Sequence, residues 1–391
     1  MEIELWWLLA VPAFFALGWA AARVDIRHLL SESRALPGSY FKGLNFLLNE
    51  QPDRAIDAFI EVVKLDPETI ELHFALGNLF RRRGEIERAI RMHTNLVNRP
   101  DLNDEQRLHA LFELGQDYLK AGMLDRAEES LARLEGTSYA GRAQTFLLEI
   151  YELEKDWDKA IRTAERVESE TGESRQKEIA QFNCERAAAS LARSQADEAR
   201  AYVDAALKAN RKAVRANMIL GDVESHARNH EAAIAAWLRI EKQDPRFLSQ
   251  VAGRLMEAYR AQGKATEGAQ LLRGLLGHYP SADLLEVTFQ VTLEVDGADN
   301  AYAVVRAELR KHPTLAGLDK LLEAQLLAAP AERTGDLSLI KSLIHAHTEN
   351  LKRYACENCG FKAKQFFWRC PGCGEWETYS PTRAEELNGN L

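Results

Sequence analysis

The sequence repeats itself with a period of about 34 residues from Ser39 onward, and this period restricts the possible folds more than any other feature. Small and aromatic residues recur at matching positions. In the four clearest units they are Gly43, Phe46, Ala55, Phe59 and Pro67; Leu76, Gly77, Phe80, Ala89 and Leu96; Tyr118 and Ala127; Tyr151 and Ala160. Small residues let two helices approach closely, and the aromatic ring fills the gap behind them. The pattern therefore predicts a stack of antiparallel helical hairpins.

The period is that of tetratricopeptide repeats, and the match becomes uneven beyond Glu170. Ser190 stands where an aromatic residue is expected, whereas Trp237 fits the pattern again. We predict an all-α tetratricopeptide-repeat superhelix of about eight units over 39–314, followed by capping helices over 315–352. An array of this kind can reach 391 residues without a single compact core.

The first helix of each hairpin is expected to line a concave groove, where repeat arrays usually hold a peptide or another protein. In the second unit the residues predicted to point into this groove are Glu71, Phe74, Asn78, Arg81 and Arg82. Amide and guanidinium groups at such positions can hold a carboxylate or a peptide backbone. The alternative for each residue is an ordinary solvated polar face. These five residues are our candidates for partner binding.

Two C-x-x-C pairs follow the repeats, within a segment that we place at 353–381. Their cysteines are Cys356, Cys359, Cys370 and Cys373. Gly360 and Gly374 supply the open φ values that the two turns need. Four thiolates bind one metal ion, either Zn²⁺ or Fe²⁺/Fe³⁺, and zinc contributes about 10–16 kcal/mol to the folding of comparable peptides. We therefore predict a small rubredoxin-like or zinc-ribbon module with one short hairpin between its pairs. A redox C-x-x-C site is less consistent with the sequence, because it needs a βαβ context.

Basic and aromatic residues surround the thiolates. They are Lys352, Arg353, Lys362, Lys364 and Arg369, with Tyr354, Phe361, Phe366, Phe367 and Trp368. Such a mixture can bind nucleic acid, but a module this small can hardly bury its aromatic residues unaided. We favour a module that docks on the acidic repeats. Cys184 stands alone in an alanine-rich helical stretch and is predicted to be a buried structural thiol.

The N-terminal stretch from Leu5 to Ala22 carries no charge and would span about 27 Å as a helix, enough for the hydrocarbon core of a bilayer. Acidic residues precede it, and basic residues follow it at Arg23, Arg27 and Arg34. The positive-inside bias then predicts a single-pass anchor at 1–22, a linker at 23–38 and a cytoplasmic remainder. A cleaved signal peptide would need positive charge before the apolar run, so we favour the uncleaved anchor.

Sequence patterns that carry catalysis are absent. No G-x-x-x-x-G-K-[ST], H-E-x-x-H or G-x-S-x-G pattern occurs. The formal charge of -9 also argues against a general nucleic-acid surface. We predict a binding protein and no enzyme, with no nucleic-acid partner.

The chain resembles the lipopolysaccharide assembly protein B family. The resemblance rests on an apolar N-terminal segment and on three stretches, Tyr40-Phe-Lys-Gly43-Leu-Asn-Phe-Leu-Leu, Leu76-Gly-Asn-Leu-Phe-Arg-Arg-Arg-Gly84-Glu and Tyr354-x-Cys356-x-x-Cys359-Gly-Phe with Trp368-x-Cys370-Pro-x-Cys373. It implies a bacterial inner-membrane adaptor that helps the membrane-bound AAA+ protease FtsH degrade LpxC, the committed deacetylase of lipid A synthesis. It also implies that the four cysteines hold the metal and that the metal module packs against the repeats. Other lipopolysaccharide assembly proteins are further expected partners, and the oligomeric state stays open.

Two other functions remain compatible with the residues. An iron ion at the four thiolates would suit a rubredoxin-like electron carrier. The pattern C-x-x-C with C-P-x-C and Trp376 is also similar to the metal finger of a bacterial recombination ATPase, which would suit a nucleic-acid adaptor. Residues 382–391 are predicted to be a tail.

Overall fold

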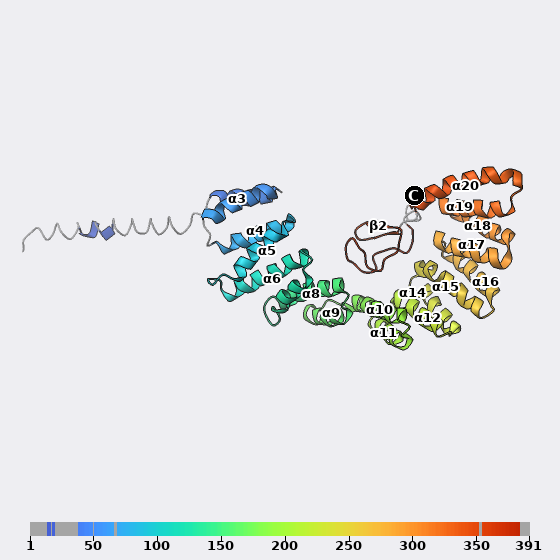
Figure 1. Cartoon of the computed structure of the whole chain (residues 1–391), viewed down its shortest axis with the longest axis horizontal. Coiled ribbons are helices and arrows are strands. Elements are labelled where there is room, and N and C mark those ends of the chain that lie inside the picture. The colour runs from blue at the N-terminus through green and yellow to red at the C-terminus, as the bar shows by residue number, and fades with distance from the viewer. Residues whose placement is uncertain are drawn as a thin grey trace, which may run out of the picture. The chain divides into compact units, whose positions relative to one another are not determined.

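The computed structural model describes residues 14–16, 18–19, 38–49, 51–65, 69–351 and 354–383. It is a chain of helices that ends in a small module with two short strands (Figure 1). The transmembrane helix predicted at Leu5–Ala22 lies mainly outside the described residues. Within the described part, no helix combines the length and the apolar character that crossing a membrane requires.

The chain divides into two compact units, at 1–154 and 155–391. In the first unit the helices are α2 (Gly38–Leu48), α3 (Pro52–Leu65), α4 (Ile70–Arg82), α5 (Ile86–Val97), α6 (Asp104–Lys120), α7 (Leu124–Ala132) and α8 (Ala140–Glu154). Neighbouring helices pack as hairpins, α2 on α3, α4 on α5 and α6 on α7, and successive hairpins stack on one another.

The second unit continues the same pattern. Its helices are α9 (Trp157–Thr171), α10 (Gln176–Ala192), α11 (Ala196–Ala209), α12 (Val214–His226), α13 (His230–Leu238), α14 (Ile240–Gln243), the 3₁₀ helix η1 (Pro245–Phe247), α15 (Leu248–Ala261), α16 (Ala265–His278), α17 (Ala282–Asp296), α18 (Ala298–Lys311), α19 (Leu315–Ala328) and α20 (Ala331–Leu351). The predicted all-α repeat fold is confirmed. Helices α19 and α20 occupy the region where capping helices are expected.

Close approach between the two helices of a hairpin explains why glycine recurs in the repeat. A Cβ atom added at Gly77 would lie less than 3.0 Å from the ring of His93, sixteen residues later. The same crowding relates Gly115 to Leu131 and Gly221 to Trp237. A large side chain from the second helix therefore fills the space that the glycine leaves open.

The C-terminal module contains strands β1 (Tyr354–Ala355) and β2 (Lys362–Ala363), which pair antiparallel. The prediction of a hairpin between Cys359 and Cys370 is therefore wrong about its position. The strands enclose the first C-x-x-C turn instead, and isolated bridges join Cys356 to Tyr379 and Arg369 to Trp376. The backbone closes round each pair of cysteines in turn.

Candidate metal centre

The four cysteines of the module converge on one point. Their Sγ atoms all lie within 4.8 Å of one another. Sγ of Cys356 lies 3.8 Å from that of Cys373, and Sγ of Cys359 lies 3.6 Å from that of Cys370. These distances exceed a disulfide bond of about 2.05 Å but match the edge of about 3.8 Å in a tetrahedron with metal–sulfur bonds of about 2.3 Å. The donor set therefore fits a single zinc or iron ion, and the geometry does not choose between them.

Two turns of the same design present the cysteines. The amide of Gly360 donates to the carbonyl of Cys356, and the amide of Gly374 donates to the carbonyl of Cys370, each at 2.9 Å. Both glycines have positive φ, +74° and +77°, which a residue with a side chain adopts only with strain. The sequence thus fixes two knuckles that place two sulfur atoms each.

The local field around the thiols is uneven. Burial opposes ionisation of Cys356, but the Thr378 hydroxyl and the backbone amides of Cys359 and Asn358 outweigh it and lower the pKa of Cys356 to about 6. Burial raises the pKa of Cys370 to about 12. A thiol of that kind becomes a thiolate at neutral pH when a cation displaces its proton, which is the charge balance that a bound metal supplies.

The module lies against the helices of the second unit through aromatic rings. Trp368 stacks on Phe247 of η1, with ring centroids 5.2 Å apart and planes inclined by 4°, and Phe366 meets the same ring edge-on at 5.8 Å. Trp376 contacts Trp157 of α9 and Phe182 of α10 at 6.2 and 5.9 Å. The predicted docking on the repeats is confirmed for Phe366 and Trp368, with Trp376 as a further contact, whereas Phe361 is exposed.

Polar contacts complete this interface. Asp283 of α17 accepts hydrogen bonds from the Tyr354 hydroxyl at 3.0 Å and from Nε of Arg383 at 3.0 and 3.1 Å. On α10, Gln181 donates to Glu377 of the module at 2.6 Å. Two of the basic residues expected to dock, Lys362 and Lys364, are exposed instead, Arg369 is partly buried, and Lys352 and Arg353 lie outside the described residues. The residues of the repeats that contact the module belong to η1 or to the first helices of hairpins, except Trp157. The module therefore covers the face of the second unit that the first helices form.

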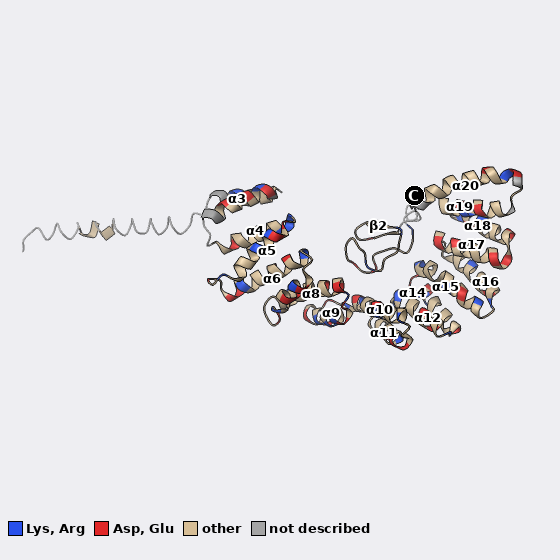
Figure 2. Cartoon of the chain, viewed as in Figure 1, with Lys and Arg blue, Asp and Glu red and all other residues tan. Residues whose placement is uncertain are grey.

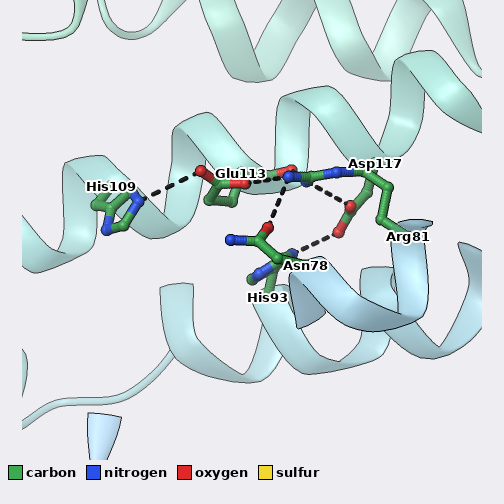
Figure 3. Close-up of polar contacts among 6 residues, drawn as sticks. All are labelled: Asn78, Arg81, His93, His109, Glu113 and Asp117. Atoms are coloured by element: carbon green, nitrogen blue, oxygen red, sulfur yellow. Dashed lines mark hydrogen bonds and ion pairs between the residues drawn. The ribbon is translucent and has the colours of Figure 1, made fainter. Parts of the chain in front are cut away.

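The predicted groove residues lie on α4, and Figure 3 shows how two of them enter a polar network. Arg81 donates to Glu113 at 2.5 Å, to Asp117 at 2.8 Å and to Asn78 at 2.6 Å. Phe74 is only 7% exposed and stacks on the ring of His109, 4.2 Å between centroids. Glu71 and Arg82 are exposed.

Sequence reasoning missed the other half of this network. His93 is fully buried, and its Nδ1 lies 2.5 Å from Asp117 on α6, whose side chain is also buried (Figure 3). A usable signal was present, since His93 stands sixteen residues after a glycine, where Phe59 and Trp237 stand in other repeats. Burial opposes the charge on Glu113, but His109 and Arg81 outweigh it and lower the pKa of Glu113 to about 2.

Charge elsewhere is mixed. Figure 2 shows lysines and arginines interspersed with aspartates and glutamates along the helices of both units. Cys184 on α10 is fully buried, as predicted, and burial raises the pKa of its thiol to about 12. Its environment is that of an inert structural thiol.

Comparison with known proteins agrees with both parts of the fold. A family described as rubredoxin metal binding domain matches residues 354–381, and tetratricopeptide repeat matches residues 42–91, 112–173 and 184–246. Lipopolysaccharide assembly protein B of Escherichia coli strain K12 is 33% identical over 384 residues, which cover 97% of this chain and 98% of that protein. The protein of the same name from Haemophilus influenzae is 29% identical over 398 residues, covering 99% of this chain and 100% of that one. The chain belongs to the lipopolysaccharide assembly protein B family.

Proposed function

We propose that this protein is a bacterial inner-membrane adaptor that limits lipopolysaccharide synthesis by promoting FtsH-mediated proteolysis of the deacetylase LpxC. The observation that carries the proposal is the similarity to lipopolysaccharide assembly protein B over 97% of the chain. In this proposal residues 1–22 form a single-pass anchor, and the repeats lie in the cytoplasm, where both the protease domain and the deacetylase can be reached.

The arrangement of the repeats supports an adaptor without chemistry of its own. In the second unit the metal module covers the face formed by the first helices. In the first unit, α4 presents the exposed side chains of Glu71 and Arg82, beside the partly buried Asn78 and Arg81. Exposed side chains of both charges, such as Glu71 and Arg82, suit recognition of a peptide or protein surface. We assign partner contact to this face of the first unit.

In this proposal the metal would have a structural role. Cys356, Cys359, Cys370 and Cys373 would hold one Zn²⁺ or iron ion, which ties the two knuckles together and keeps the aromatic residues of the module aligned with the repeats. A second candidate function, electron transfer at iron, is favoured by the exposure of Cys359 at the edge of the centre. Metal content of protein purified without added metal, together with a reduction potential, separates these roles.

The experiment for the adaptor is affinity capture from bacterial membranes, read by mass spectrometry. Capture of the FtsH protease and the deacetylase by the full chain supports the proposal. A matched variant carries an unrelated apolar helix in place of residues 5–22. Loss of the protease from this variant alone assigns its recruitment to the anchor, whereas the absence of both proteins from the full-chain capture would contradict the proposal.

A further inference from the structure

A small pocket opens in the first unit between α3, α4 and α5. Its volume is about 300 Å³. Ile60, Leu76, Phe80 and Met92 line its apolar part, and Ile60 and Met92 are only partly buried against the surrounding core. A volume at the lower end of the range for ligand pockets suits one large side chain rather than a long acyl chain.

The rim of this pocket is cationic. Arg88, Arg91 and Asn95 lie on α5 and are exposed. The Arg88 guanidinium lies 4.0 Å from the centre of the Phe80 ring and is paired with Glu85, so its position is fixed. Arg91 differs, because within the described part of the chain no carboxylate lies within 4.0 Å of its guanidinium. Arg91 and Asn95 are one turn apart on the same helix face, with Met92 beside them.

The neighbouring repeats serve as internal controls. Alignment on the packed glycines Gly43, Gly77 and Gly115 places Arg54, Arg88 and Arg126 at one position, each with its guanidinium over an aromatic ring. That arginine is therefore a feature of the repeat.

The arginine at position 91, in contrast, is not shared by the neighbouring repeats. The matching residues are Asp57 in the preceding repeat and Glu129 in the following one, and the residues matching Met92 are Ala58 and Ser130. Neither difference is needed for the helices to pack, since the repeats on either side fold with the opposite charge and a smaller side chain. The combination of an unpaired cation with an apolar floor thus distinguishes this hairpin from the repeats on either side of it.

We propose that this pocket, the Arg91 pocket, binds an acidic peptide segment that inserts one large apolar side chain against Met92 and places a carboxylate on Arg91. A guanidinium binds a carboxylate through two parallel hydrogen bonds, and the Asn95 amide can donate a further one. The apolar floor of the pocket supplies affinity, and the cationic rim selects peptides that carry a negative charge. This site goes beyond the proposed function and does not depend on it.

Methionine methyl groups offer a direct test in the full chain. The protein contains five methionines, of which Met92 lines the pocket, Met123 lies at another surface site, and Met218 and Met256 are buried in the second unit. The chain is labelled with methyl-¹³C methionine and placed in lipid nanodiscs, and the Met92 signal is assigned with a Met92→Leu variant. The probe is a capped pentapeptide with phenylalanine followed by two aspartates. Control peptides carry two asparagines in place of the aspartates, or serine in place of phenylalanine.

The expected result is a saturable shift of the Met92 signal with the acidic apolar peptide and none with either control peptide, while the Met218 and Met256 signals stay in place. Arg91→Gln weakens binding about tenfold or more, as the loss of a charge-assisted hydrogen bond requires, and Lys120→Gln at an exposed site of the same unit leaves it unchanged. An unchanged Met123 signal in the free Arg91→Gln protein shows that the first unit remains folded, because Met123 belongs to the same unit and lines a different pocket. Four results would each overturn the proposal. They are no shift of Met92 at millimolar peptide, equal shifts with all three peptides, unaltered binding by Arg91→Gln, and a stronger shift with octanoate, which is added separately as a fatty-acid probe.

Discussion

Trp368 is expected to contribute more than any other single side chain to the docking of the metal module, and its replacement by alanine measures that contribution. Its ring is stacked on Phe247 at 5.2 Å, and the Arg215 guanidinium lies 5.4 Å from its centre. The stacked pair contributes about 1 kcal/mol and the cation–π contact about 0.5–1 kcal/mol. Burial of about half of an indole adds about 2–3 kcal/mol. The docked state should lose about 4 kcal/mol, or about a thousandfold in its equilibrium with an undocked state.

Hydrogen exchange read by mass spectrometry is the assay. In Trp368→Ala, peptides covering residues 366–379 of the module and 245–251 of the repeats should exchange faster together, because both sides of the interface open in the same event. Metal content should stay the same as in the unaltered protein, because Trp368 is not one of the four candidate metal ligands. The matched control is Phe361→Ala, an aromatic residue of the module that is 42% exposed. Equal exchange in Trp368→Ala and in the unaltered protein would refute the reasoning.

Three further predictions concern the thiolates, the polar network and the packed glycines. Cys370→Ser removes one of four ligands and should lower metal content well below one per chain, with earlier proteolysis within 354–383; full metal content and unchanged protection would count against the site. Glu113 has a folded pKa of about 2, below its ordinary value of 4.5, so its ionised form stabilises the first unit above pH 4.5 and that contribution is lost as the pH falls toward 2. The unfolding free energy of α6 is measured by hydrogen exchange corrected for intrinsic rates. From pH 6 to pH 3.5 it should fall by about 1.4 kcal/mol more in the unaltered protein than in Glu113→Gln. Parallel pH profiles of the two proteins would contradict the ion pairs of Glu113. Gly221→Ala should destabilise the second unit by about 1–3 kcal/mol through collision with Trp237, whereas Gly253→Ala, where the added methyl group meets no atom within 4 Å, should stabilise its helix by about 0.5–1 kcal/mol; thermal unfolding followed by tryptophan fluorescence compares them.

The repeat architecture could be predicted because its determinants are local and periodic. Gly77 and Gly221 mark close helix approaches that any hairpin of this length must make, and Gly360 and Gly374 mark turns whose φ values the sequence itself fixes. The four thiolates belong to the same class of signal, because their spacing defines the knuckles before any tertiary contact forms.

The receptor for the metal module could not be predicted in the same way. Phe182, Phe247 and Asp283 come from separate hairpins, and nothing in their local sequence indicates that they meet Trp376, Trp368 and Tyr354. Their pairing depends on how the hairpins of the second unit stack, which is a tertiary property. The same holds for the pairing of His93 with Asp117, where the packed position of the repeat was recognisable but its partner on the next hairpin was not.

We propose above that the chain acts as an adaptor for degradation of the lipid A deacetylase. The most direct measurement is the half-life of LpxC after synthesis is stopped, in cells that lack this protein and in the same cells supplied with it. We expect LpxC to persist in the deficient cells and the full chain to restore its rapid, FtsH-dependent loss. Equal half-lives with and without the chain would contradict it.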